Sequence, residues 1–242
     1  MPEPDHRDTV RCMTNDPAPA TQRPANAVRA LPPRIIAMLV LVAGWFLVAI
    51  AISLLIRLEL GVAPYDVLNV GLGERIGVAP GTAMWITGTI LVLLAWILGQ
   101  RPGPATPLGF LTIGFFINLT LPLVPETSGL ALRVALLVPG LLLLYQGVCL
   151  IIVSGLGAGP TEVLMLALSE RGLGLKVSRW LIELGCAGVG YLLGGPVGVL
   201  TVLLVALAAP IISLLLPLNT RLLAPVVTGN RGASDAASPN VD

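Results

Sequence analysis

Apolar residues fall into six long runs, which short polar segments separate, and the chain begins and ends with polar segments. Each run has close to the roughly 17–25 residues that an α-helix needs to cross a hydrocarbon core of about 30 Å. A backbone inside the bilayer must satisfy its own hydrogen bonds, so the runs are expected to be helices. The pattern predicts an all-α membrane protein with six transmembrane helices. The predicted spans are residues 35–56, about 81–98, about 107–124, 134–153, about 177–193 and about 197–216.

A polar stretch that contains a proline follows the first span and recurs 96 residues later, after the fourth span. It reads LGVAPYDVLNVGLGERIG at residues 60–77 and LGAGPTEVLMLALSERGLG at residues 156–174. The repeated unit is one span, this stretch and two further spans, and it covers residues 34–124 and 130–218. A unit with three crossings reverses the side on which the next unit enters. The two tandem repeats are therefore predicted to be inverted relative to each other, as in many secondary transporters.

Each copy of the stretch is expected to form a short helix that begins at its proline, because proline fits the first helical turn. A glycine in the preceding loop, a carboxylate in the first turn and an arginine in the last turn also recur, as the helix dipole favours. These motif residues are Gly61, Pro64, Asp66 and Arg75 in the first copy and Gly157, Pro160, Glu162 and Arg171 in the second. The helices, residues 64–76 and 160–171, would be about 20 Å long or less, too short to cross. Two placements remain open: flat at the membrane surface, or re-entrant and shielded by the bundle.

Composition supports the membrane assignment and excludes several functions. The chain is 55% hydrophobic and only 11% charged, whereas a soluble domain has about 25% charged residues. The net charge of +1 gives no basic footprint for a nucleic acid. The three cysteines have no metal-ligand spacing, and the single histidine, His6, lies in the N-terminal polar segment. We therefore expect no metal, no cofactor and no enzymatic activity.

The basic residues predict the orientation. With the N-terminus inside and six crossings, eleven Lys and Arg residues lie on the cytoplasmic side and three outside. The positive-inside rule favours that arrangement, with both termini cytoplasmic. Residues 1–33 and 224–242 are polar and lack an apolar run, so they are predicted to be disordered cytoplasmic tails.

Five polar residues are candidates for a substrate or ion site. Asp66 and Asn69 share one face of the first short helix, and Glu162 is the equivalent of Asp66 in the second copy. The carboxylates of Asp66 and Glu162 fit a cation- or proton-coupled site. The alternative interpretation is that they stabilise the N-termini of their helices. Glu183 is the only acidic residue inside a predicted span, and Arg179 lies one turn before it. This pair fits either a binding site or a structural ion pair.

The two repeated stretches, with WILGQRPG, TPLGFLTIGFFINL and YLLGGPVGVLTVLLVALAAPII, resemble the YczE/YyaS/YitT-like bacterial integral membrane proteins, particularly the YczE branch. The resemblance covers residues 34–218. The second stretch reads GPTE where the family more often has Gly-Pro-Arg-Asp, so Thr161 takes the place of an arginine. The resemblance implies a multi-pass protein of the bacterial plasma (inner) membrane and names neither a substrate nor catalytic residues.

Two functions follow from this sequence. The first is a small permease that moves a small solute or ion through a site between the inverted repeats. The second is a membrane-embedded partner that regulates or anchors another protein and transports nothing. A protein partner or a homo-oligomer is compatible with either function. A cavity that reaches Asp66, Glu162 or Glu183 favours transport, whereas a solid bundle with an apolar groove favours the partner role.

Overall fold

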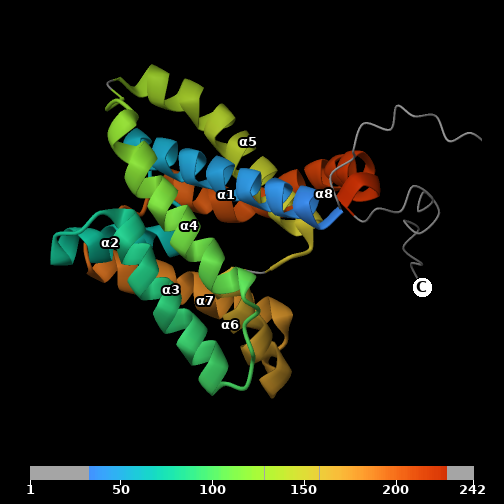
Figure 1. The fold of residues 1–242 in the computed structure, drawn as a ribbon. Coiled ribbons are helices and arrows are strands. Elements are labelled where there is room, and N and C mark those ends of the chain that lie inside the picture. Colours follow the sequence, from blue (N-terminus) through green and yellow to red (C-terminus); the bar gives the residue numbers. More distant parts are fainter. Residues whose placement is uncertain (1–32, 128, 158, 228–242) are drawn as a thin grey trace, which may run out of the picture. The chain divides into compact units, whose positions relative to one another are not determined.

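The computed structural model describes residues 33–127, 129–157 and 159–227, and these residues form helices and connecting segments without a β-strand. The tails expected from the sequence lie outside the described residues, except that α1 begins at Pro33 and α8 includes residues 224–227. The elements, drawn in Figure 1, are α1 (Pro33–Leu58), α2 (Pro64–Ile76), α3 (Pro80–Ile97), α4 (Ala105–Thr120), η1 (Leu121–Leu123), α5 (Leu130–Ser154), α6 (Pro160–Leu168), η2 (Ser169–Leu173), α7 (Leu175–Leu192) and α8 (Val199–Val227).

Five of the described helices are long and apolar enough to cross a membrane: α1, α3, α4 extended by η1, α5 and α8. The helix α7 has 18 residues but is not among them, and it carries Lys176, Arg179 and Glu183. The chain is therefore an all-helical, multi-pass membrane protein. The fifth span expected from the sequence, about 177–193, falls on α7, and its crossing of the membrane stays a prediction.

Local sequence sets the bounds of α2. Its first residue is Pro64, and the preceding Ala63 is extended. Its last residue is Ile76, and the next residue, Gly77, has a left-handed φ of 74°, a conformation that costs glycine little. The backbone N–H of Val78 then donates to the Gly73 carbonyl at 2.9 Å and closes the last turn.

The second short helix, α6, ends three residues earlier than the expected residue 171. It stops at Leu168 and continues into one π-helical turn, η2. Inside that turn Gly172 adopts a φ of 97°, which an α-helix does not accommodate. The two copies of the repeat therefore begin alike, each at its proline, and end differently.

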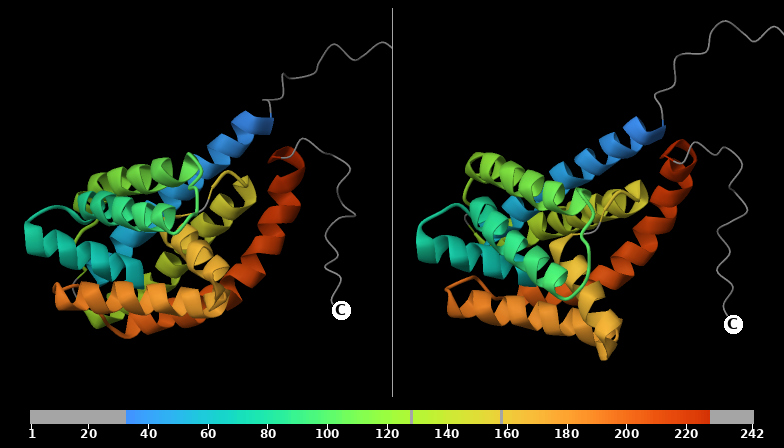
Figure 2. Two further views of the ribbon diagram at one scale, coloured as in Figure 1. Left: turned by 90° about the horizontal axis from the view of Figure 1, so that it is seen from below. Right: turned by 60° about the horizontal axis from the view of Figure 1, so that its bottom comes forward.

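Two apolar clusters hold the helices together. The larger cluster joins α1, α4, α5 and α8, with Met84 from α3. The smaller one joins α3, α6 and α7 through Leu91, Val163 and Ile182, among others. The helix α2 packs mainly on α7 and α3, so its first turn is held against both neighbours. The start of α1 and the end of α8 lie at the same end of this helical unit in Figures 1 and 2.

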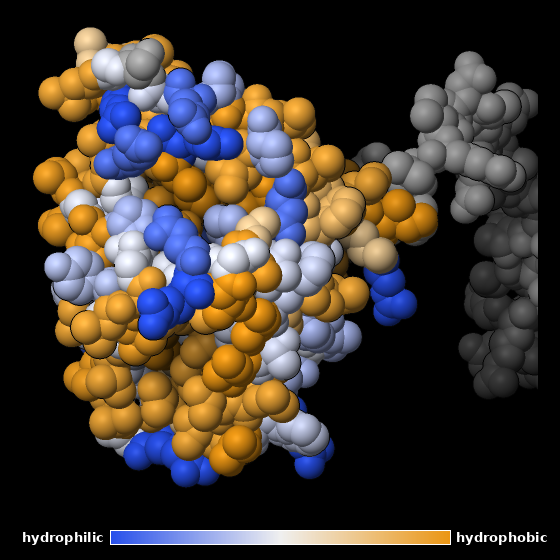
Figure 3. Space-filling view, turned by 90° about the vertical axis from the view of Figure 1, so that its left-hand side faces the viewer, coloured by the Kyte–Doolittle hydropathy of each residue, from blue (hydrophilic) through white to orange (hydrophobic). Residues whose placement is uncertain are grey.

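Apolar side chains also cover much of the outer surface. Figure 3 shows one face of the molecule, on which hydrophobic residues dominate and hydrophilic residues gather in separate small patches. Large side chains such as Ile97, Leu192, Val199 and Leu214 are at least three-quarters exposed. An apolar exterior of this extent marks a surface that water does not cover, as expected for helices in a bilayer.

The loop between α1 and α2 touches the start of α8 with its backbone. The N–H of Leu200 donates to the Leu60 carbonyl at 3.1 Å. The approach requires glycines, because a Cβ on Gly198 would overlap the Leu60 carbonyl and a Cβ on Gly61 would overlap the backbone of Gly198. Gly61 also has a φ of +105°. This contact links a residue of the first repeat, Leu60, with a residue of the second, Leu200.

Candidate functional site

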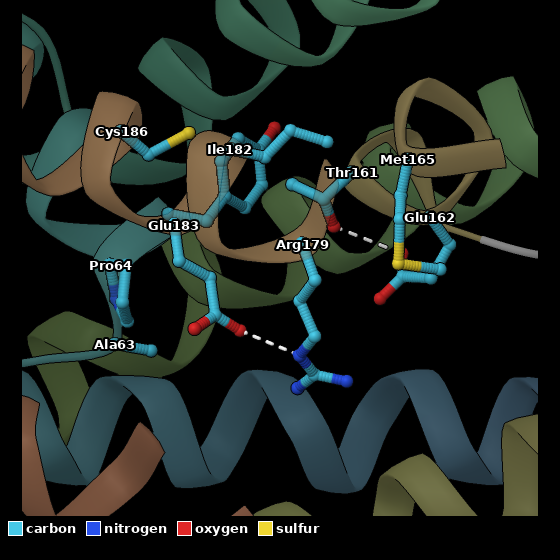
Figure 4. Close-up of a pocket in the computed structure, with 10 residues that line it drawn as sticks. Ala63, Pro64, Thr161, Glu162, Met165, Arg179, Ile182, Glu183 and Cys186 are labelled. Carbon is cyan, nitrogen blue, oxygen red and sulfur yellow. Dashed lines mark hydrogen bonds and ion pairs between the residues drawn. The ribbon is translucent and has the colours of Figure 1, made fainter. Parts of the chain in front are cut away.

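The described residues enclose a cavity of about 170 Å³ where the first turns of α2 and α6 face α7. In Figure 4, Pro64 lies on one side and Thr161 and Glu162 on the other, with Arg179 and Glu183 between them. The two repeated stretches thus reach the same cavity from residues nearly a hundred positions apart. The lining residues are Ala63, Pro64, Tyr65, Thr161, Glu162, Met165, Arg179, Ile182, Glu183 and Cys186.

Both short helices point their N-terminal ends at the cavity, since the lining residues of α2 and α6 come mostly from their first turns. Neither Ala63 nor Gly159, the residues that precede the two prolines, caps its helix with a side-chain hydrogen bond. Helix N-termini carry a partial positive charge and unsatisfied N–H donors. The two ends therefore present similar backbone chemistry to the cavity.

The helix α7 contributes an ion pair. The Arg179 Nε donates to the Glu183 Oε1 at 2.9 Å, one turn apart, as Figure 4 shows. The Glu183 side chain is 22% exposed, while Arg179 is more than half exposed. Glu162 adds a second carboxylate, which accepts a hydrogen bond from Thr161 Oγ1 at 3.0 Å. The charged groups of the cavity are thus two carboxylates and one guanidinium.

Asp66 lies behind the cavity wall and is 7% exposed. It follows Pro64 and Tyr65, which line the cavity, and no Lys or Arg of the described part of the chain forms a salt bridge with it. Burial raises the pKa of this carboxyl from 3.8 to about 7, and the neighbouring Asn69 opposes part of the rise. A buried carboxyl without a cation favours its neutral form.

A hydrogen-bonded chain connects the cavity with Asn69. Tyr65 lines the cavity, and its hydroxyl lies 3.1 Å from Thr87 Oγ1, which donates to Asn69 Oδ1 at 2.5 Å. Because the Thr87 proton goes to Asn69, the Tyr65 hydroxyl donates to Thr87. Asn69 is 1% exposed, and its Nδ2 has no hydrogen-bond partner of normal geometry among the described residues.

The structure divides the predicted site residues into two groups. Glu162, Arg179 and Glu183 line the cavity together, whereas Asp66 and Asn69 are buried beside it. Tyr65 and Thr87 were not among the site residues predicted from the sequence. The repeat spacing of 96 residues could have indicated both, because it relates Tyr65 to Thr161 and Thr87 to Glu183, which line the cavity.

Among the predicted motif residues, Pro64 lines the cavity. Pro160 is the first residue of α6, whose next residues, Thr161 and Glu162, line the cavity. Gly157 packs against Ala105 at the start of α4. The two arginines lie elsewhere: Arg171 Nε donates to the Leu98 carbonyl at 3.2 Å, and Arg75 is exposed. We find no group of three or more His, Cys, Asp or Glu side chains that could hold a metal ion within the described residues.

Three uncharacterised bacterial proteins are similar to this chain. The uncharacterised membrane protein YczE of Bacillus subtilis is 28% identical over 200 residues, which cover 81% of this chain and 93% of the relative. An uncharacterised protein of Haemophilus influenzae is 29% identical over 171 residues, covering 70% and 78%. The uncharacterised protein YyaS of Bacillus subtilis is 29% identical over 187 residues, covering 74% and 91%.

These relatives confirm the resemblance that the motifs indicated. No solved structure matches the chain. The model of a family of unknown function, DUF6198, matches residues 35–217. Since that match covers most of the sequence, the chain belongs to this family, whose function is not characterised.

Proposed function

We propose that this protein is a small permease that moves a small solute or ion through a site between two inverted repeats. The cavity at which the first turns of α2 and α6 meet carries this proposal. Inverted-repeat transporters build their sites from short helices whose N-terminal ends face the substrate near the middle of the membrane. The proposal gives the cavity a binding role and assigns no catalytic step to it.

Equivalent helices of the two repeats pack in equivalent ways, which supports the inversion. A shift of 96 residues relates α2 to α6 and α3 to α7. The helix α2 packs on α7, and correspondingly α6 packs on α3. Likewise α1 packs on α4 and α5 on α8, while α1 and α5, the first spans of the two repeats, pack on each other. A pseudo-two-fold axis that passes near α1 and α5 would relate each of these contacts to its equivalent.

We propose that α7 also crosses the membrane despite its charges, which brings the number of crossings to six. Its 18 residues correspond to about 27 Å of helix, close to the thickness of the hydrocarbon core. Arg179 and Glu183 pair with each other and line the cavity, and charged residues in membrane helices usually face such an interior. The start of α1 and the end of α8 lie at one end of the unit (Figures 1 and 2), which supports an even number of crossings.

Six crossings and the distribution of basic residues support a plasma-membrane protein with both termini in the cytoplasm. The volume of about 170 Å³ is below the roughly 300–1,000 Å³ of pockets for drug-sized ligands. We therefore propose a solute of only a few non-hydrogen atoms, or an ion. Carboxylate, guanidinium and hydroxyl groups in the wall favour a polar or charged solute over an apolar one.

Uptake into proteoliposomes tests this role. The purified full chain is reconstituted, and uptake is measured for six probes: sodium, potassium, ammonium, methylammonium, acetate and glycine. We expect uptake of at least one probe above that of protein-free liposomes, and a loss of that uptake in Asp66→Asn and Glu162→Gln. Glu74→Gln is the matched control, since Glu74 is exposed at the other end of α2.

Two results contradict parts of the proposal. Uptake equal to that of protein-free liposomes for all six probes argues against a permease for small ions and solutes. Uptake that neither carboxylate substitution changes removes Asp66 and Glu162 from the mechanism.

The alternative is a membrane-embedded partner that regulates or anchors another protein. One observation favours it: α8 is the least covered by the rest of the chain among the five apolar helices, so it offers an apolar face to another membrane helix. Substituting exposed α8 residues such as Val202 and Leu214 with alanine distinguishes the roles. A partner that contacts α8 would lose binding, whereas a permease would keep its uptake.

A further inference from the structure

We propose that the Asp66 carboxyl is the proton-binding group of this permease, and that it exchanges its proton with the cavity as the two repeats move. The inference rests on the transport role proposed above and names the coupling ion as a proton. It concerns a simple equilibrium, in which a carboxylate oxygen of Asp66 takes up one proton and releases it again.

The position of Asp66 favours a proton over a metal cation. The side chain is buried, and no cation pairs with it in the part of the chain that the structure describes. An unpaired buried carboxylate is costly, whereas a carboxylic acid is not. A metal cation needs several oxygen ligands around it, and the side chain that interacts with the Asp66 carboxyl is the amide of Asn69.

The groups that face Asp66 from the packed helices do not stabilise its charge. The helix α3 has no ionisable residue, and it contributes the Thr87 hydroxyl. The helix α7 contributes Cys186, with Glu183 and Arg179 one and two turns closer to its N-terminus. Arg179 is the cation of this group, and it is already paired with Glu183. From α2 itself comes the hydroxyl of Tyr65, while Glu74 is exposed at the other end of that helix, and Glu162 lies across the cavity.

Asn69 provides a second, independent indication. Its Oδ1 accepts from Thr87, which fixes the orientation of the amide. Its Nδ2 is fully buried and has no hydrogen-bond partner among the residues that the structure describes. An unsatisfied buried donor is costly, so such a group normally has a use. A donor beside the Asp66 carboxyl can stabilise the carboxylate that forms when the proton leaves.

The path to the cavity is short. Tyr65, the residue before Asp66, lines the cavity, and so does Cys186, which lies close enough to Asp66 to sense its charge. The hydroxyls of Tyr65 and Thr87 connect the cavity to Asn69. A small movement of α2 against α7 therefore exposes Asp66 to the cavity.

Glu162, the equivalent of Asp66 in the second repeat, indicates the environment that Asp66 would reach through that movement. Glu162 is exposed at the cavity wall, while Asp66 is buried behind it. In a permease of inverted repeats the two halves exchange environments when access switches sides. Asp66 then reaches water and releases its proton. The raised pKa of Asp66, about 7, is consistent with loading and release near neutral pH.

Infrared difference spectroscopy tests the proton site without any substrate. Spectra of the full chain in lipid nanodiscs are recorded between about pH 5 and about pH 9, which brackets the expected titration of this carboxyl. We expect the carbonyl band of a buried carboxylic acid in the wild type, with a midpoint near 7. The band is lost in Asp66→Asn and kept in Glu162→Gln, the matched control. If Asp66→Asn does not fold, Asp66→Glu is used, and a shift of the band identifies the group.

The outcomes separate this inference from the transport role. A wild type without a buried-acid band, or a band that persists unchanged in Asp66→Asn or Asp66→Glu, overturns the proton site whatever the uptake shows. Uptake of a probe that depends on pH in the wild type and not in Asp66→Asn supports coupling, and unaltered pH dependence in Asp66→Asn overturns it. A clear Asp66 band with no uptake of any probe keeps the proton site and rejects the permease.

Discussion

The stability of the protein should depend on pH through Asp66, and the substitution Asp66→Asn should remove that dependence. This carboxyl is buried, and no cation of the described residues pairs with it. Burial raises its pKa from 3.8 to about 7. Because the pKa is higher in the folded state, the folded chain binds more protons than the unfolded chain between these values. Stability therefore falls as pH rises through that window and stays low above it.

The size of the effect follows from the two pKa values. The pKa rises from 3.8 to about 7 on folding, and each pKa unit corresponds to about 1.36 kcal/mol. Ionisation of Asp66 above pH 7 therefore lowers the free energy of unfolding by about 4 kcal/mol. At about pH 5 the cost is about 2 kcal/mol, because the carboxyl would already be mostly ionised in the unfolded chain. Between about pH 5 and about pH 8 the wild type should thus lose about 2–3 kcal/mol through this one group. Asparagine has nearly the shape of the neutral acid and carries no charge to bury.

Thermal unfolding of the purified protein in detergent measures this. The apparent Tm is recorded for the wild type, Asp66→Asn and Glu162→Gln at both pH values. Asp66→Asn should gain more over the wild type at the higher pH than at the lower, whereas Glu162→Gln should follow the wild type because Glu162 is exposed. If the difference between the wild type and Asp66→Asn is the same at both pH values, Asp66 does not titrate in this window and the reasoning from its burial is wrong.

Two further substitutions test the packing around the site, each by thermal unfolding against a matched control. Gly61→Ala should lower the Tm more than Gly77→Ala, because both glycines have positive φ but only a Cβ at Gly61 meets the backbone of Gly198; equal losses would mean that the contact contributes nothing. Thr87→Val should cost about 1–3 kcal/mol, since it leaves the buried Asn69 and the partly buried Tyr65 without their shared partner. Thr89→Val, which removes a hydroxyl from the exposed face of the same helix, should cost less, and the reverse order would refute the hydrogen-bonded chain.

Several features could be predicted from the sequence because they depend on local chemistry. Apolar runs of membrane-crossing length predicted a helical membrane protein, and the motifs predicted the family. The start of α2 at Pro64 and its end before Gly77 follow from the missing N–H of proline and the permitted positive φ of glycine. The crossing of α7 could not be settled in this way, because whether three charged residues exclude a helix from the bilayer depends on what those charges face.

Only the tertiary structure decided which polar residues lie together. Asp66 and Glu162 occupy equivalent positions in the repeat, yet Asp66 is buried and Glu162 lines the cavity. Both carboxylates stand two residues after the proline and before Val-Leu. The difference in burial arises from the packing of α2 on α3 and α7. The partnership of Thr87 with Asn69 likewise depends on the packing of α3 against α2. Helix formation depends on neighbouring residues, but burial depends on contacts between segments far apart in the chain, and those contacts bury the carboxyl of Asp66.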